Sequence, residues 1–130
     1  SSEYLSKSLG NEKWVRICEK RACDDVRTKN FPRNAQVEGA VRAAYESYIL
    51  IRFDQADQVV KDLFVNGLRD LNGFFAQLQF EYKTQLYRRK SLIILDEIQL
   101  FPQARQALKT LLEDGRYDYL ETGSLAGMQF

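Results

Sequence analysis

The stretch Ser91–Phe101, which reads SLIILDEIQLF, is the part of the chain that best indicates its fold. Four consecutive apolar residues, Leu92 to Leu95, run directly into two adjacent carboxylates, Asp96 and Glu97. A short uninterrupted apolar run rich in isoleucine is typical of a strand buried on both faces, as in a parallel sheet covered by helices. Ligands of open α/β sheets bind outside the carboxyl ends of the strands. The two acids therefore mark a candidate functional site.

Two interpretations of Asp96 and Glu97 remain open from this stretch alone. In the first, Asp96 holds Mg²⁺, as the aspartate at this place does in nucleotide hydrolases of the P-loop kind, and Glu97 is the general base for the attacking water. In the second, the two carboxylates only begin the next helix, where their charge favours the positive end of the helix dipole. The context along the chain has to decide between them.

The composition is that of an ordinary soluble globular protein, with 45% hydrophobic and 28% charged residues. A length of 130 residues suits one domain but is small for a complete nucleotide-hydrolysing enzyme. Nineteen basic and eighteen acidic residues leave a net charge of +1, so nucleic acid is not an expected partner of this chain. No apolar run approaches the roughly 20 residues of a membrane span, and no membrane association is expected.

The chain contains no histidine and two cysteines, Cys18 and Cys23. The lack of histidine excludes Ser–His and Cys–His catalysis by this chain and any metal held by histidine. The first 30 residues are polar and carry no secretory signal, so the two cysteines are expected to be reduced thiols. The expected location is the cytoplasm.

Residues 1–47 give the weakest signals and are expected to form a divergent or poorly ordered N-terminal part. Within them, residues 14–18 (WVRIC) are a possible first strand, and residues 36–47 a short helix that Gly39 weakens. The charged stretch that contains Pro32 predicts a loop between the two.

Residues 48–130 are expected to form a partial α/β core. The apolar patterns predict strands at 48–53, 92–95 and 117–121, and helices at 57–66, at 68–82 and after Pro102 as far as Gly115. Strands that alternate with helices indicate a parallel sheet with right-handed crossovers and flanking helices, in three layers. Three such strands leave one sheet edge exposed, which is either a liability for solubility or a docking surface.

Parallel strands would bring Asp54, the two acids and the turn Thr122-Gly123-Ser124 to one edge of the sheet. A hydroxyl of Thr122 or Ser124 at that edge could hydrogen-bond the attacking water or a terminal phosphate. The same residues also serve as turn formers and helix caps, and the sequence leaves both roles open.

The span from Tyr48 to Gly127 resembles the AAA-type ATPases of bacteria and archaea that usually carry a C-terminal domain of unknown function. The matching residues are ESYILIRFD at 46–54 and LIILDEIQLFPQARQALKTLLEDGRYDYLETGS at 92–124. The order of DEIQ, a proline, a helix, an acidic-Gly-Arg turn and TGS makes the resemblance specific. It implies a P-loop NTPase core that binds ATP with Mg²⁺ and hydrolyses it.

The resemblance also implies roles for single residues. Asp96 is similar to the Mg²⁺-coordinating carboxylate of a Walker B strand, and Glu97 to its catalytic partner. Ser124 is similar to the sensor of the terminal phosphate, and Thr122 and Gly123 are expected to contact the cofactor.

The sequence departs from this family in its phosphate loop, G-x-x-x-x-G-K-[ST], which is expected upstream of Tyr48 and is missing. Two remnants are possible, at residues 33–39 (RNAQVEG) and at residues 21–25 (RACDD). Both place carboxylates where a cation should face phosphate, and like unit charges about 4 Å apart repel by roughly 4 kcal/mol at an effective dielectric constant of 20.

The chain is also expected to lack the fifth strand, the helical lid, the arginine finger and the C-terminal domain, so the core is expected to be truncated. Two functions follow as predictions. The first is ATP binding and Mg²⁺-dependent hydrolysis, weakened by the missing phosphate loop. The second is a non-hydrolysing, ATPase-like remnant that acts through self-association or a protein partner.

Overall fold

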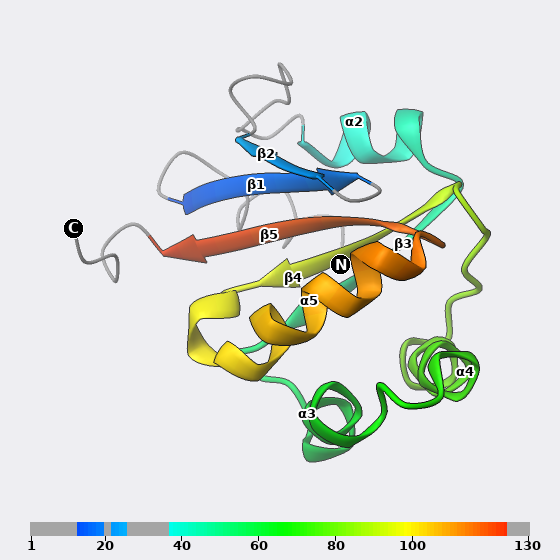
Figure 1. Ribbon diagram of the computed structural model, residues 1–130. Coiled ribbons are helices and arrows are strands. Elements are labelled where there is room, and N and C mark those ends of the chain that lie inside the picture. The colour runs from blue at the N-terminus through cyan, green and yellow to red at the C-terminus, as the bar shows by residue number, and fades with distance from the viewer. Residues whose placement is uncertain (1–12, 20–21, 26–36, 125–130) are drawn as a thin grey trace.

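The computed structural model describes residues 13–19, 22–25 and 37–124, and the structural statements below refer to these residues. They form a five-stranded sheet with the strand order β2-β1-β5-β4-β3 (Figure 1). The predicted polar segment before residue 13 and the loop with Pro32 lie outside the described residues. The strands are β1 (Lys13–Glu19), β2 (Ala22–Asp25), β3 (Ser47–Arg52), β4 (Ser91–Asp96) and β5 (Asp118–Ser124). The helices are α2 (Val37–Ala44), α3 (Gln58–Asn66), α4 (Leu71–Tyr82), the short 3₁₀ helix η2 (Ile98–Leu100) and α5 (Pro102–Asp114).

Strands β3, β4 and β5 form the parallel part of the sheet. Ser47 pairs with Ser91 at the start of β3 and β4, and Leu92 pairs with Asp118 at the start of β4 and β5. All six residues of β4 are buried, as its uninterrupted apolar run predicts. The predicted α/β class, with flanking helices in three layers, is confirmed.

Strand β1 joins the sheet in the opposite direction, because it pairs antiparallel with β5 from Lys13↔Ser124 to Cys18↔Tyr119. Strand β2 pairs antiparallel with β1 in turn, so the complete sheet is mixed rather than parallel throughout. A possible strand was expected at residues 14–18, and β1 occupies Lys13–Glu19. The predicted turn at residues 122–124 is wrong, because pairing with β1 extends β5 to Ser124.

The division of the chain into two parts at residue 47 stays a prediction.

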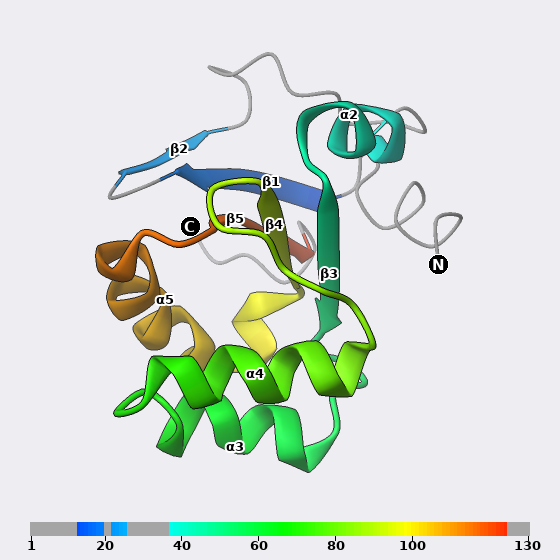
Figure 2. The ribbon, with the colours of Figure 1, turned by 90° about the vertical axis from the view of Figure 1, so that its right-hand side faces the viewer.

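The helices cover the two faces of the sheet unequally. Helices α3, α4 and α5 pack on one face around a chain of aromatic rings, and α2 covers part of the other (Figure 2). The rings of Phe53, Phe64, Phe74, Phe75 and Tyr117 meet edge to face with centroids 4.9–5.5 Å apart. On the opposite face, Val41 of α2 is buried in a smaller apolar cluster. The ends of α4 and α5 follow ordinary capping rules, with the Asp70 carboxylate accepting from Gly73 N–H (3.2 Å) and Gly115 ending α5 at φ 78°.

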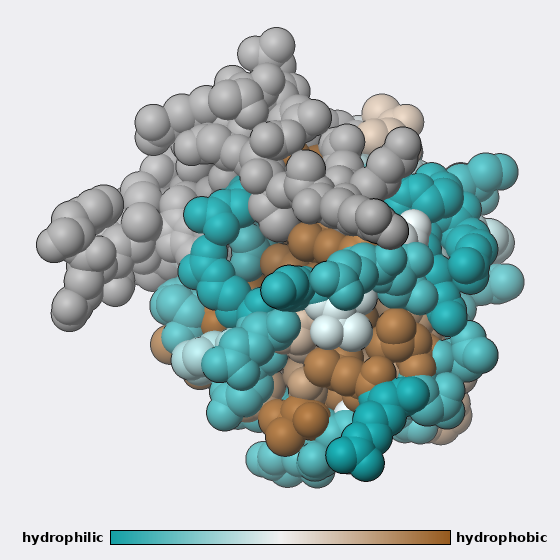
Figure 3. All heavy atoms as spheres, in the orientation of Figure 1, coloured by the Kyte–Doolittle hydropathy of each residue, from teal (hydrophilic) through white to brown (hydrophobic). Residues whose placement is uncertain are grey.

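Most of the apolar surface lies inside this three-layer arrangement. Figure 3 shows apolar residues interspersed among hydrophilic ones on the face that carries α5. The described residues contain no helix with the length and hydrophobicity needed to cross a membrane. The large apolar side chains that stay exposed are Val59, Val65, Phe80, Tyr87 and Leu100.

The prediction that the cysteines are reduced is wrong for Cys18, which is disulfide-bonded. The register of the β1–β2 hairpin places Cys18 directly opposite Cys23, the other cysteine of the sequence. Cross-strand neighbours in an antiparallel pair have Cβ atoms close enough for a disulfide. The sequence argument used the expected compartment, whereas strand pairing decides the distance between the two residues.

Candidate functional site

The site begins with the side chains that meet where β4 and β5 end. Leu95 and Glu121 are register partners, so Asp96 and Thr122, one residue further along, lie next to each other. The Thr122 hydroxyl donates a hydrogen bond to Asp96 Oδ1, and both side chains are fully buried. The same hydroxyl oxygen accepts a hydrogen bond from Glu97 N–H at 3.2 Å. One threonine therefore fixes the carboxylate of Asp96 and the backbone of Glu97.

Glu97 has a left-handed backbone conformation, with φ 57° and ψ 45°. This conformation is uncommon for a residue other than glycine and is often found at functional sites. The Glu97 side chain is half-buried, and its Oε1 accepts a hydrogen bond from Gln99 Nε2 at 3.0 Å. Glu97 is the N-cap residue of the short helix η2, but its side chain makes no capping hydrogen bond there, and α5 begins only at Pro102. The left-handed turn instead directs the chain away from the sheet directly after Asp96.

Strand β3 contributes a cation to the same edge that the sequence analysis did not single out. Arg52 is the register partner of Asp96, and its guanidinium lies 3.6 Å from the carboxylate of Asp54. Phe53 N–H donates to the Asp96 carbonyl at 3.0 Å, which holds the ends of β3 and β4 together. Asp54 therefore lies at the expected edge, but as the ion-pair partner of an arginine. The only sequence signal for Arg52 was a charged residue at the end of an apolar strand.

The last two predicted site residues continue the strand beyond Thr122. Gly123 and Ser124 pair through the backbone with Trp14 and Lys13 of β1. The structure thus brings Asp96, Glu97 and Thr122 together through hydrogen bonds, whereas Ser124 lies two residues further along β5. The side chain of Ser124 lies outside the described part of the chain.

Glu121, on β5, is a second buried acid that the sequence analysis missed. Its carboxylate is 1% exposed and lies 3.6 Å from Arg105 of α5 and 3.5 Å from Arg16 of β1. Burial raises the pKa of Glu121 above its usual value, and the two guanidinium groups oppose that increase. This cluster connects β1, β5 and α5. It lies on the face of the sheet opposite to Asp96, because neighbouring strand residues point to opposite faces.

The donor set at the edge is compatible with Mg²⁺ that a nucleotide brings with it. Mg²⁺ is usually bound by one or two carboxylates while phosphate oxygens and waters complete its shell. Asp96 supplies one such carboxylate, and Thr122 fixes its orientation. Among the described residues there is no group of three or more acidic, cysteine or histidine side chains able to form a metal site by themselves.

The structure also distinguishes between the two possible remnants of a phosphate loop. Residues 22–25 of the RACDD remnant form β2, an outer strand of the sheet, so they do not form a loop that leads into a helix. In the other remnant, residues 33–36 lie outside the described residues, and Glu38 and Gly39 belong to the first turn of α2. A phosphate loop leads directly into a helix, so the remnant at residues 33–39 has the matching position.

The parallel strands and the acids at their carboxyl edge define the class, an α/β domain of the P-loop NTPase type. A family model described as "AAA domain" matches residues 33–130, which is more than half of the chain. The chain therefore belongs to the AAA domain family. Neither the curated proteins nor the solved structures compared with it give a match. The matched residues include α2 to β5, whereas the antiparallel strands β1 and β2 precede them.

Proposed function

We propose that this AAA domain binds ATP with Mg²⁺ at the carboxyl edge of β4 and β5, and that Asp96 is the protein ligand of the metal. The observation that carries the proposal is the hydrogen-bonded set of Asp96, Thr122 and Glu97 N–H at the ends of two adjacent parallel strands. The match to the AAA domain family supports the same assignment, because open α/β sheets bind ligands outside the carboxyl ends of their strands.

In this proposal each residue has a separate role. Asp96 holds the metal, and Thr122 keeps the Asp96 carboxylate in one orientation. Glu97 orients the attacking water and accepts its proton, and Ser124 senses the terminal phosphate. Thr122 and Gly123 contact the cofactor. Bound Mg²⁺ would neutralise charge that develops on the phosphate oxygens.

Titration calorimetry with ATP and Mg²⁺ tests the binding step, and phosphate release tests hydrolysis. We expect Asp96→Asn to abolish Mg²⁺-dependent binding, because an amide is a poor ligand for this ion. Glu97→Gln should keep the binding and lower the hydrolysis rate by about 10²- to 10⁴-fold, the usual contribution of a general base. Glu113→Gln, an exposed acid on α5, is the matched control. No binding heat at millimolar ATP with Mg²⁺ would refute the proposal.

A second function, a non-hydrolysing ATPase-like module that acts through self-association or a protein partner, is favoured by one specific observation. Asp96 is fully buried in the structure, and its Oδ1 is already engaged by Thr122. A buried carboxylate that binds no metal is costly to desolvate, so Asp96→Asn would then stabilise the fold. Increased stability of this variant, together with unchanged nucleotide affinity, would favour the second function.

We also propose the cytoplasm, where ATP and Mg²⁺ are available, as the location. The disulfide at Cys18 is the observation against it, because reducing compartments rarely maintain such bonds.

A further inference from the structure

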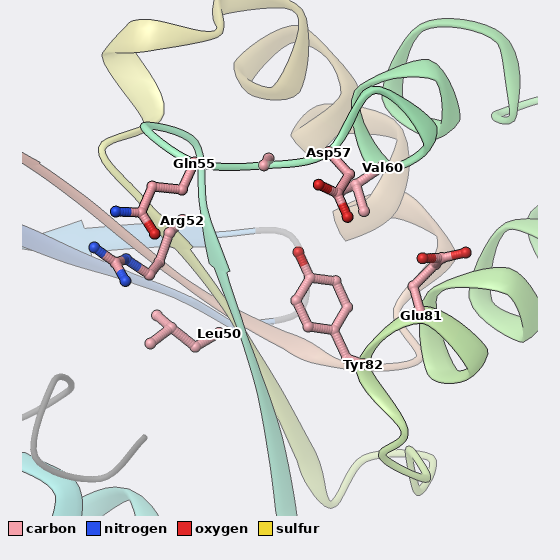
Figure 4. A pocket seen from close by; sticks show the side chains of 8 residues that line it. Leu50, Arg52, Gln55, Asp57, Val60, Glu81 and Tyr82 are labelled. Carbon is pink, nitrogen blue, oxygen red and sulfur yellow. The ribbon is translucent and has the colours of Figure 1, made fainter.

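A cavity of about 200 Å³ is lined by residues of β3, α3, α4 and the loop between β3 and α3, and by none of the acids at the ends of β4 and β5. Its walls are the end of β3, the first turn of α3 and the last turn of α4 (Figure 4). The Tyr82 side chain points from α4 toward the loop that connects β3 with α3, and Asp57 lies above its hydroxyl (Figure 4). The cavity is therefore next to the outer edge of the sheet.

That outer edge offers backbone groups for a further strand. Strand β3 is the last strand of the sheet and pairs with β4 on one side only, among the described residues. Phe53 N–H points to β4, where it bonds the Asp96 carbonyl. Backbone groups alternate in direction along a strand, so those of Tyr48 and Leu50 point outward. An extended polypeptide can satisfy such groups by adding a strand to the edge.

The cavity beside this edge has an excess of negative charge. Asp57 and Glu81 line it, and neither carboxylate forms an ion pair with a basic side chain in the described part of the chain. The one cation in the lining, Arg52, already lies 3.6 Å from Asp54. Burial, followed by the charges of Asp57 and Glu81, raises the pKa of Tyr82 to about 12. The negative potential therefore extends to the Tyr82 hydroxyl inside the cavity.

The remaining wall of the cavity is mostly apolar, with Gln55 as its one neutral polar residue. Leu50, Ala56 and Val60 line it beside the two carboxylates. A lysine or arginine side chain matches this combination, because its aliphatic stem packs on apolar surface while its charged head reaches polar groups. Glu81 Oε1 accepts a hydrogen bond from the neutral Gln77 Nε2 at 2.9 Å, but an acidic or a small neutral occupant would leave both carboxylates without a cation.

We propose that the edge of β3 binds an extended polypeptide segment of a partner protein, which adds a strand to the sheet and places a lysine or arginine in the cavity at Asp57 and Glu81. The backbone groups of Tyr48 and Leu50 provide the pairing, and the two carboxylates provide the selection for a basic side chain. This surface uses neither Asp96 nor Glu97, so it does not depend on nucleotide binding.

Capped pentapeptides with the sequence Thr-Val-Lys-Val-Thr, and the same peptide with glutamate in place of lysine, test the proposal on the full chain. Binding is followed by NMR, using the amide shifts of Tyr48 and Leu50. We expect the lysine peptide to shift these amides and to bind about tenfold more tightly than the glutamate peptide, the ratio that corresponds to about 1.4 kcal/mol. The double variant Asp57→Asn/Glu81→Gln should remove this difference, and Glu113→Gln should leave it unchanged.

The Asp57 carboxylate makes no capping hydrogen bond to α3, so its replacement by asparagine is expected to leave the helix intact. The amide spectrum of the double variant checks this point directly. Equal affinity for the two peptides, or no shift at Tyr48 and Leu50 at millimolar peptide, would overturn the proposal. Concentration-dependent loss of these two signals without peptide would overturn it in favour of pairing between two copies of the chain.

Discussion

Replacing Thr122 by valine removes one hydroxyl from the centre of the candidate site while nearly keeping the side-chain volume. The hydroxyl donates to the buried carboxylate of Asp96 and accepts from Glu97 N–H. A hydrogen bond to a charged group contributes about 1.5–3 kcal/mol, and a buried N–H left without a partner costs about 1–3 kcal/mol. The additional methyl group regains up to about 1 kcal/mol by apolar burial. We therefore expect Thr122→Val to lower the free energy of unfolding by about 3 kcal/mol.

Urea unfolding at pH 7, followed by circular dichroism, measures this change, and Thr122→Ser is the matched control. Serine keeps both hydrogen bonds and loses one methyl group, at a cost of about 1 kcal/mol. In a thermal scan, the valine variant should unfold about 10 °C below the wild type. The difference in the free energy of unfolding between the valine and serine variants gives the contribution of the hydroxyl to stability.

A valine variant as stable as the serine variant would refute the reasoning, because both buried groups would then have found other partners. Loss of stability without loss of Mg²⁺–ATP binding would separate the structural role of Thr122 from its proposed role at the cofactor. The assay thus distinguishes a threonine that only supports the fold from one that also positions Asp96.

Two further predictions concern buried groups on β5. Burial raises the pKa of Glu121 above 4.5, so its stabilising contribution is complete below pH 4.5 and is lost as the pH rises through the raised pKa. In urea titrations from pH 4 to pH 7, the stability of the wild type relative to Glu121→Gln should therefore decrease with pH; a constant or rising difference would contradict this. The hydroxyl of Tyr119 is buried and has no hydrogen-bond partner among the described residues, so Tyr119→Phe should raise the free energy of unfolding by about 1 kcal/mol. A variant that is clearly less stable than the wild type in the same urea assay would show that the hydroxyl has a partner in solution.

Local sequence patterns were sufficient where the signal lies within one element. The apolar run of β4, fully buried in the structure, predicted a central strand, and the periodicity after Pro102 predicted α5. The two ends of α5 followed from Pro102 and Gly115, whereas α4 begins at Leu71 after the Asp70 cap and not at residue 68 as predicted. These features depend on contacts between residues a few positions apart, so a single stretch of sequence carries them.

Pairing between distant segments was not predictable in the same way. The turn expected at residues 122–124 became strand because β1, more than a hundred residues earlier, supplies its hydrogen bonds. The same pairing set the hairpin register that placed Cys18 opposite Cys23. Strand direction and register are decided by the whole sheet, and no local pattern in β1 specifies its neighbour.

The sequence by itself determined the α/β class, the buried strand that ends at Asp96 and Glu97, and the family resemblance. Only the tertiary structure showed that the hydroxyl of Thr122 bonds Asp96, and that Glu97 leaves the sheet through a left-handed turn. It also placed Asp57, the residue before α3, and Glu81 of α4 in one cavity beside the outer edge of β3. The physical reason is that apolar periodicity is a local property, whereas the meeting of polar groups depends on how distant elements pack.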